Sequence, residues 1–298
     1  MFIIKEHIVP IGISEIRLID YALSIFPEIP TRSAMKKAIS RGEIVVNDIH
    51  EKSGLWISSG QSIKLIDLEL APPKPLDLPL EVVFEDDHLA IINKPSGIEI
   101  SGNKYFTIQN ALVSNLGIST QADALKWARP VHRLDRPTTG LLLVAKTASS
   151  LANLGHQFEN NQVHKKYRAL VAGRIDDSGE LNTPVGGKES YTKYNCIGRC
   201  RSLKTDWISE VDLYPETGRR HQLRIQLADF GYPIVGEKEY GDGPVLKGKG
   251  LFLSSLELSF THPYTRVPVT FSIDAPIKFD SLMKKEQLRW EKSNGSID

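Results

Sequence analysis

Runs of apolar residues alternate with amphipathic stretches along most of the chain, and each pattern predicts one kind of element. Residues 140–147 (GLLLVAKT) are almost continuously apolar, which predicts a strand buried inside a sheet. Residues 147–160 follow with apolar positions at helical spacing and with Thr147 as a suitable N-cap, so we expect a helix there. Further strands are expected within residues 80–97, 165–173, 207–215, 251–260 and 267–273, and further helices over 107–117 and 217–231. Because helices and strands mix without a regular alternation, the pattern predicts an α+β domain with a mixed, largely antiparallel sheet.

The first seventy residues show a different arrangement. Apolar positions over residues 16–23 have near-helical spacing, and a second helix can start at Thr31 or Ser33 and end at Gly42. Two short β-branched runs separated by turn residues follow this second helix. Residues 1–70 are therefore predicted to form a small module of a helix pair and a sheet.

Four prolines at positions 72, 73, 75 and 79 separate this module from the rest of the chain. Proline lacks the amide donor and fixes its own φ, so we expect a linker over residues 71–80. Residues 81–280 then form the larger domain, and residues 281–298 are expected to be a charged tail in which residues 284–298 form a helix that frays. A chain of 298 residues is long enough for both domains.

Composition excludes several classes of protein. Apolar residues make up 41% of the chain, which is enough for a core, and a net charge of +1 excludes a uniformly basic or acidic coat. Two cysteines cannot form a disulfide framework, and Cys196 and Cys200 lack the companion ligands of a structural zinc site. The first residues resemble no signal peptide, and no window is apolar enough to span a membrane. We therefore expect a cytoplasmic protein without membrane contact.

Basic charge is concentrated locally. Residues 126–224 contain seventeen Lys or Arg against ten Asp or Glu, which favours a polyanionic partner for this part of the chain. Five aromatic residues of the same stretch are able to stack on unpaired bases: Trp127, Tyr167, Tyr191, Tyr194 and Trp207. In the small module, Arg32, Lys36 and Lys37 can share one helix face, although a run of charge is often only a solvated surface.

One carboxylate has an unusual setting. Asp135 lies between Arg133 and Arg136, directly before a Thr-Thr-Gly turn and the apolar strand. Neighbouring guanidinium groups favour the charged form of a carboxylate, as a nucleophile or a base acting on a sugar requires. The alternative is a structural Asp that caps the turn and pairs with arginine.

These residues resemble two known families. Residues 130–146 (PVHRLDRPTTGLLLVAK) match the HRLD-x-x-T-S-G motif of the RluA family of pseudouridine synthases, and further similar landmarks follow in order over residues 80–276. The small module, with IRLIDYAL and then TRSAMKKAISRGEIVVND, resembles the RNA-binding module of ribosomal protein S-four; Asp48 replaces the usual glycine. The landmarks also depart from the RluA pattern, at Thr139 for serine and at Glu237 for aspartate, and we expect the second departure to concern packing more than catalysis.

The resemblance implies a role for each residue. Asp135 corresponds to the catalytic aspartate, Tyr167 to the active-site tyrosine, Arg224 to the arginine that pairs with the aspartate, and Arg133 to the residue that replaces the flipped base. The chemistry detaches uracil from its sugar and rejoins it through carbon 5, either through a covalent adduct or through an unsaturated sugar.

Further RNA contacts are assigned to Arg136 and Arg220. The resemblance of the small module to the S-four module implies RNA contact for Arg32, Lys36 and Lys37 as well. Helical spacing would put Arg220 and Arg224 on one face of a helix, so that one serves the carboxylate and the other a phosphate. The expected partner is RNA, ribosomal RNA of the large subunit rather than transfer RNA, bound by a monomer without a metal or nucleotide cofactor.

Two rival functions remain open at this stage. A non-catalytic RNA-binding or ribosome-assembly factor could keep the same fold. A base-releasing hydrolase would need a second catalytic carboxylate, and the matched motifs offer no second candidate for that role. His132, His221 and His262 could each be a general base, but a structural hydrogen bond is the favoured role for all three.

Overall fold

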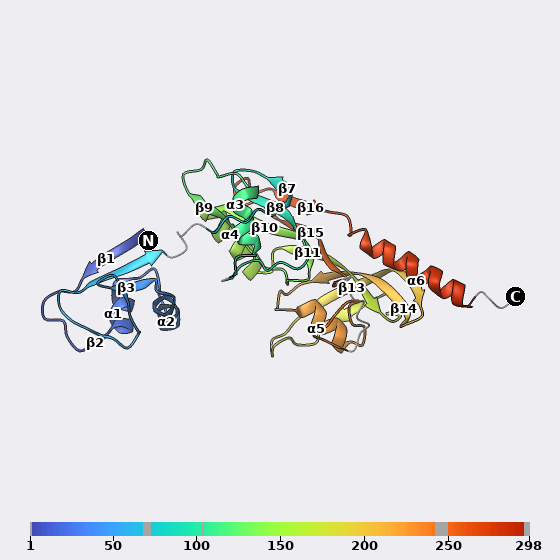
Figure 1. The fold of residues 1–298 in the computed structure, drawn as a ribbon, viewed down its shortest axis with the longest axis horizontal. Helices are drawn as coiled ribbons and strands as arrows, with labels where there is room; N and C mark the ends of the chain where they lie inside the picture. Colours follow the sequence, from blue (N-terminus) through green and yellow to red (C-terminus); the bar gives the residue numbers. More distant parts are fainter. Residues whose placement is uncertain (1, 68–72, 103, 242–249, 295–298) are drawn as a thin grey trace. The chain divides into compact units, whose positions relative to one another are not determined.

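The structure is a computed structural model that describes residues 2–67, 73–102, 104–241 and 250–294 (Figure 1). The chain divides into two compact units, residues 1–72 (unit 1) and residues 73–298 (unit 2). No helix of the described residues is both long enough and apolar enough to cross a membrane.

Unit 1 combines a helix pair with a small antiparallel sheet. Its elements are β1 (Phe2–Ile8), β2 (Ile16–Arg17), α1 (Leu18–Ile25), α2 (Arg32–Arg41), β3 (Ile44–Val46), β4 (Ile49–His50), β5 (Trp56–Ile57) and β6 (Ser62–Asp67). The sheet has the order β1-β6-β3-β4, and β2 pairs separately with β5. The predicted helix pair and sheet are present, whereas strand β1 was not predicted.

Local sequence explains the ends of helix α2. The hydroxyl of Thr31 accepts a hydrogen bond from the amide of Ala34, and Gly42 ends the helix with a φ of 81°. Both caps are therefore confirmed. Asn47 and Asp48 make the tight turn between β3 and β4 with φ angles of 49° and 66°, a region in which Asn and Asp are more tolerated than most residues.

Unit 2 is a mixed α+β domain. Its elements are β7 (Glu81–Glu85), β8 (Leu89–Lys94), α3 (Ile108–Asn115), β9 (Ala124–Pro130), β10 (Thr139–Thr147), α4 (Ala148–Glu159), β11 (His164–Ala172), β12 (Ser178–Leu181), β13 (Thr192–Ser202), β14 (Asp206–Pro215), α5 (Gln222–Asp229), β15 (Leu253–Thr261), β16 (Pro268–Ser272) and α6 (Lys278–Asn294). The predicted fold class is confirmed.

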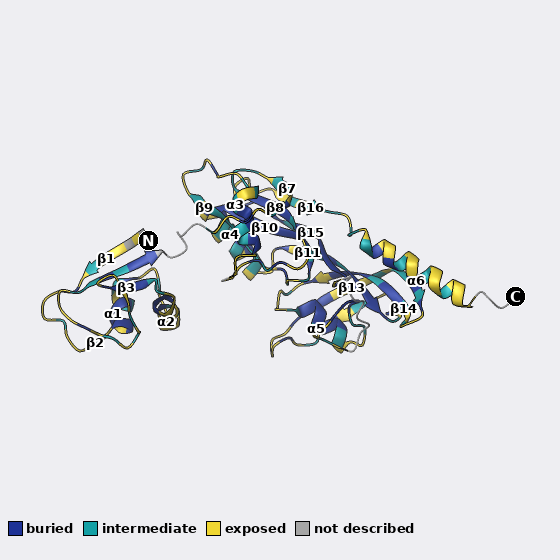
Figure 2. Ribbon diagram, viewed as in Figure 1, coloured by how far each residue is buried: buried dark blue, intermediate teal, exposed yellow. Residues whose placement is uncertain are grey.

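A ten-stranded sheet organises this unit. Its main order is β12-β13-β14-β11-β15-β10-β8-β7, with β16 beside β15 and β9 beside β10. Among the strand pairs of the described residues, β10 and β15 alone are parallel, with Thr139 opposite Ser254 and Gly140 opposite Ser255. Figure 2 shows that the central strands are buried, while much of α6 is exposed. Gly140 has a φ of 107°, and a Cβ there would lie 2.1 Å from the carbonyl oxygen of Ser255, so the close parallel pairing requires glycine.

The structure corrects the expected linker and tail. Residues 73–80 have no regular secondary structure, yet Leu76 and Leu80 are buried in the core of unit 2, because proline prevents helix and strand but not side-chain packing. Positions 71 and 72 lie outside the described residues. The helix expected in the tail is present as α6, but it begins earlier, at Lys278, and buried Phe279, Leu282 and Glu286 hold it against the sheet. Residues 295–298 also lie outside the described residues.

Candidate active site

A pocket opens beside the parallel pair at the centre of the sheet. Three segments bring side chains into it: the loop before β10 contributes Asp135, strand β11 contributes Tyr167, and helix α5 contributes Arg224. Leu253, the first residue of β15, also lines the pocket. The three residues for which the resemblance implies a catalytic role therefore surround one cavity, which we call the Asp135 pocket.

A buried lysine, Lys94, supports the loop that carries Asp135. The amide of Thr138 donates to the carbonyl of Asp135 at 3.0 Å and closes the turn. The Nζ of Lys94 donates to the carbonyls of Pro95 (2.9 Å), Arg136 (3.2 Å) and Thr138 (2.9 Å). Burial lowers the pKa of Lys94 to about 8, against the opposing effect of the negative charge of Asp135. This ammonium group holds the turn on which Asp135 stands.

Arg224 contacts three carboxylates at the Asp135 pocket. Its Nη1 lies 3.6 Å from Oδ2 of Asp135, and its Nε and Nη2 each donate at 2.7 Å to the carboxylate of Glu237. Both Arg224 and Glu237 are buried, and the exposed Glu239 approaches Nη2 at 3.4 Å. Glu237 was expected to concern packing more than catalysis, and its carboxylate fixes the guanidinium that faces Asp135.

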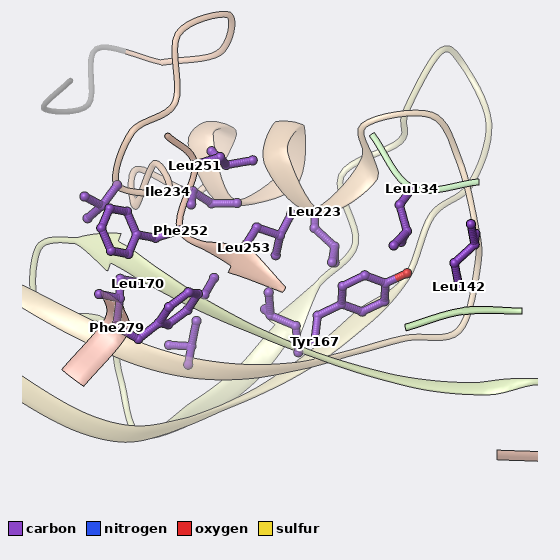
Figure 3. Packing of buried hydrophobic residues seen from close by; sticks show 14 of the residues in the cluster. Leu134, Leu142, Tyr167, Leu170, Leu223, Ile234, Leu251, Phe252, Leu253 and Phe279 are labelled. Carbon is purple, nitrogen blue, oxygen red and sulfur yellow. The ribbon is translucent and has the colours of Figure 1, made fainter. Parts of the chain in front are cut away.

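Tyr167 forms an apolar wall of the Asp135 pocket. The residue is buried, and Figure 3 shows its ring between Leu223 and Leu134 at one end of the hydrophobic cluster. Burial raises the pKa of the Tyr167 phenol to about 12, and the polar side chain of Ser255, which lies opposite Tyr167 on β15, opposes this increase. The phenol is therefore protonated at neutral pH.

His221 also reaches this pocket, although sequence reasoning gave it only a structural role. It precedes α5 with a left-handed φ of 58°, its Nε2 lies 3.5 Å from Oδ1 of Asp135, and its Nδ1 lies 2.7 Å from the hydroxyl of Tyr240. The other two histidines are structural, as expected. His132 accepts a hydrogen bond from a backbone amide, and His262 pairs with a carboxylate at 2.8 Å.

The three other cations predicted to bind RNA in unit 2 lie on the surface beside the Asp135 pocket. Arg133, Arg136 and Arg220 are exposed and line a second hollow that adjoins the Asp135 pocket. Arg220 does not share a helix face with Arg224, because helix α5 begins only at Gln222 and the left-handed His221 intervenes. The predicted helix over 217–231 is thus shorter at its start, which corrects the basis of the Arg220 assignment.

The three predicted cations of unit 1 are exposed on helix α2. Arg32 forms an ion pair with Asp20, while the structure gives no ion pair for Lys36 and Lys37 within the described residues. Across the same described ranges, no group of three or more His, Cys, Asp or Glu side chains is arranged to hold a metal ion.

Comparison with known proteins identifies the family. The sequence pattern of the RNA pseudouridylate synthase family matches residues 88–229, which include Asp135, Tyr167 and Arg224. Ribosomal large subunit pseudouridine synthase D of Zymomonas mobilis is 33% identical over 253 residues, which cover 74% of this chain and 77% of that protein. The dual-specificity RNA pseudouridine synthase RluA of Haemophilus influenzae is 32% identical over 216 residues, 66% of this chain and 94% of that protein.

Structural comparison agrees on the fold. The human RNA pseudouridylate synthase domain containing 1 superposes with a TM-score of 0.56 at 24% identity, covering 66% of this chain and 84% of that one. The fold, the order of the motifs and the sequence identity to these relatives agree. This chain belongs to the RluA family of RNA pseudouridine synthases, enzymes that isomerise uridine in RNA.

Proposed function

We propose that this enzyme isomerises uridines of large-subunit ribosomal RNA and that Asp135 is its catalytic carboxylate. The observation that carries the proposal is the Asp135 pocket, where the carboxylate faces the buried Arg224 at 3.6 Å and only 14% of its side chain is exposed. Relatives named as large-subunit synthase D support the choice of RNA.

The reaction needs one carboxylate and no water. Either Asp135 attacks C1′ of the target nucleotide, so that an ester bond forms as the C1′–N1 bond breaks, or it removes the C2′ proton as the C1′–N1 bond breaks and an unsaturated sugar results. In both routes the released uracil anion turns and its C5 bonds to C1′, while the ester bond breaks in the first route and the proton returns to C2′ in the second. C5 then loses its proton and N1 takes one up. The product is an isomer of the substrate, so the pocket must keep base and sugar together and exclude water.

Arg224 and Tyr167 have complementary roles in this proposal. The Arg224 guanidinium, held by Glu237, keeps a positive charge beside Asp135 while the charge on the carboxylate changes. The buried Tyr167 ring offers a flat apolar surface to the uracil.

Exposed arginines at the mouth of the pocket would bind the RNA backbone. A uracil inside a stem is inaccessible, so the target base must leave the stack before it reaches Asp135. We propose that Arg133 fills the gap in the stem, and that Arg136 and Arg220 contact phosphates. The exposure of all three side chains beside the pocket supports these roles.

We further propose that unit 1 is an S-four-like RNA-binding module. Its helix pair, its small sheet and the exposed Arg32, Lys36 and Lys37 on α2 are compatible with a surface that contacts phosphates. A second RNA-binding unit on the same chain would raise the effective concentration of RNA at the active site.

The test is a pseudouridine map of total RNA from a deletion strain that carries the wild-type protein, the Asp135→Asn variant or no protein. We expect modified uridines in large-subunit ribosomal RNA only with the wild-type protein. A third variant, Lys36→Gln with Lys37→Gln, should lower the occupancy of the same sites without abolishing it.

Each alternative gives a different result. Modification confined to transfer RNA would overturn the choice of substrate, and full modification by Asp135→Asn would overturn its catalytic role. Free uracil among the products would indicate a base-releasing hydrolase. Three identical maps, together with RNA binding, would favour a non-catalytic RNA-binding factor.

A further inference from the structure

A third hollow, which we call the side groove, adjoins the Asp135 pocket. Its outer wall is formed by the end of helix α4 and the residues after it, with Phe158 and Asn161, and by His132. The Phe158 ring is half-buried and stacks on His132 at a centroid distance of 4.7 Å. An aromatic ring on the wall of a groove provides a surface on which a base can stack.

The two hollows share a short boundary that is rich in cations. Arg133, Lys165 and Arg219 line both the Asp135 pocket and the side groove, together with Tyr167, Thr217 and Gly218. Within the described residues, the structure gives no ion pair for any of the three cations. Glu159 is the one carboxylate among the described residues that line the side groove. The boundary between the hollows therefore carries positive charge that no protein carboxylate balances.

Lys165 is the least exposed of these cations. It lies two residues before Tyr167 on strand β11, so both side chains point to the same face of the sheet. Burial lowers the pKa of the Lys165 ammonium, and its charge contributes, after burial, to lowering the pKa of His132 to about 4. In the described part of the chain, no hydrogen-bond acceptor is paired with its Nζ. A partly buried ammonium without an acceptor is costly, and an anion supplied by a ligand would remove that cost.

The covalent structure of RNA indicates which anion this is. If the target nucleoside occupies the Asp135 pocket, the neighbouring nucleotide must leave through an adjoining hollow. The phosphodiester that joins the two nucleotides then crosses the boundary between the hollows, where Lys165 and Arg219 lie. An ammonium and a guanidinium are the side chains that bind phosphate most strongly.

We propose that Lys165, assisted by Arg219, forms a phosphate subsite that binds the phosphodiester next to the target uridine, and that the neighbouring nucleotide lies in the side groove against Phe158. The inference rests on the proposed function, because it requires the target uridine to be in the Asp135 pocket. Lys165 acts here as a substrate-positioning residue. It makes no bond to the atoms that react.

The test compares Lys165→Met, which keeps the length of the side chain but removes the charge, with Lys165→Arg, which keeps the charge. Lys204→Met is the matched control, because Lys204 is exposed in the turn between β13 and β14, outside both hollows. The substrate is [5-³H]uridine-labelled RNA from the deletion strain, and tritium release reports turnover. Rates are measured between about 50 and 200 mM KCl, where phosphate contacts are strongly salt-dependent.

We expect Lys165→Met to raise KM about tenfold, the effect of losing one charge-assisted hydrogen bond, while kcat changes less than about twofold. The plot of log(kcat/KM) against log[KCl] should become shallower by about 0.7, the value for one phosphate of a single strand. Lys165→Arg should have a KM and a salt slope close to those of the wild type, and Lys204→Met should match the wild type in both. A fall in kcat with an unchanged salt slope would instead assign Lys165 to the base and overturn the phosphate subsite.

A binding measurement separates this inference from the function on which it rests. Affinity for a fluorescein-labelled uridine octanucleotide is measured over the same salt range for the wild type and Lys165→Met. Equal slopes for the two proteins contradict the phosphate subsite, whether or not tritium is released. Absence of tritium release by the wild-type protein, with unequal binding slopes, contradicts the proposed function and leaves the anion site supported.

Discussion

The carboxylate of Glu237 provides the sharpest test of how the active site is built. Glu237→Gln keeps the shape of the side chain but removes its charge, and it replaces one acceptor oxygen by a donor. In the wild type, the two oxygens of Glu237 accept hydrogen bonds from Nε and Nη2 of Arg224, both at 2.7 Å. The amides of Lys238 and Glu239 donate to the same carboxylate at 2.8 and 2.9 Å. The substitution therefore leaves one guanidinium N–H opposed by an amide group.

The size of the effect follows from burial. Glu237 is 1% exposed and Arg224 is 3% exposed, so neither group can turn to water after the change. Removing one partner of a buried ion pair costs about 3 to 5 kcal/mol, because the remaining charge is left without compensation. Burial raises the pKa of Glu237, but the hydrogen bonds from Arg224 and the two amides outweigh burial and leave this pKa below 4.5. The stabilisation is therefore present above about pH 4.5 and is lost as the pH falls through the lowered pKa.

The assay is urea unfolding at pH 7, followed by tryptophan fluorescence, because three of the four tryptophans lie in unit 2. We expect Glu237→Gln to lower the free energy of unfolding by about 3 to 5 kcal/mol and to lower kcat at least about tenfold, since the guanidinium beside Asp135 is no longer fixed. Glu239→Gln is the matched control, because Glu239 is 56% exposed and approaches the same guanidinium at 3.4 Å; an exposed pair contributes only about 0 to 1 kcal/mol. Equal stability and activity of the two variants would refute the reasoning.

Two further predictions concern the support of the Asp135 loop. Gly140→Ala should destabilise unit 2 by about 2 to 5 kcal/mol in urea unfolding, because its Cβ would clash with the backbone of Ser255 at a positive φ; Gly155→Ala, a helical position with open space around it, should not destabilise it. Lys94→Met should lower kcat, since three buried carbonyls lose their donor. Because the pKa of Lys94 is lowered from 10.5 to about 8, the wild type should gain stability relative to Lys94→Met as the pH rises from 8 to 10.5, and a constant difference between the two proteins would contradict the assignment.

Local patterns predicted much of this fold. Thr147 and Thr107 were correctly expected at helix starts, and each hydroxyl accepts the hydrogen bond of an N-cap from the amide three residues later. The apolar run 140–147 was correctly expected to be a buried strand. These elements depend on interactions within a few residues, which the sequence contains directly.

Local sequence patterns did not predict the strands that depend on pairing with distant parts of the chain. Strand β13 has an irregular alternation with glycine at position 198, where its pairing with β14 shifts register, so no clear period of two is visible. Strand β1 is a run of mixed polarity that is paired with β6, forty or more residues away. A charged helix was correctly expected near the end of the chain, but the packing of α6 was not, because it depends on three positions that periodicity alone did not separate.

The candidate site shows the same limit. The motif resemblance suggested Asp135, Tyr167 and Arg224, and the structure brings all three to one pocket. The motif resemblance gave no indication that Glu237 accepts a hydrogen bond from Arg224. Thirteen residues separate the two, and the sequence around a carboxylate in a loop does not indicate whether it is buried.

The parallel contact between β10 and β15 explains why the pocket lies where it does. Because these strands run in the same direction, their first residues, Thr139 and Leu253, lie at the same end of the sheet. The loop that leads into β10 therefore ends beside the start of β15, and the hydroxyl of Thr139 donates to Ser254 at 3.0 Å. Strand β11 runs antiparallel to β15 and sets Tyr167 opposite the next residue of β15, Ser255. An antiparallel β10 would carry its leading loop to the opposite end of the sheet, so the reversal of one strand direction is what brings the carboxylate and the phenol into a single cavity.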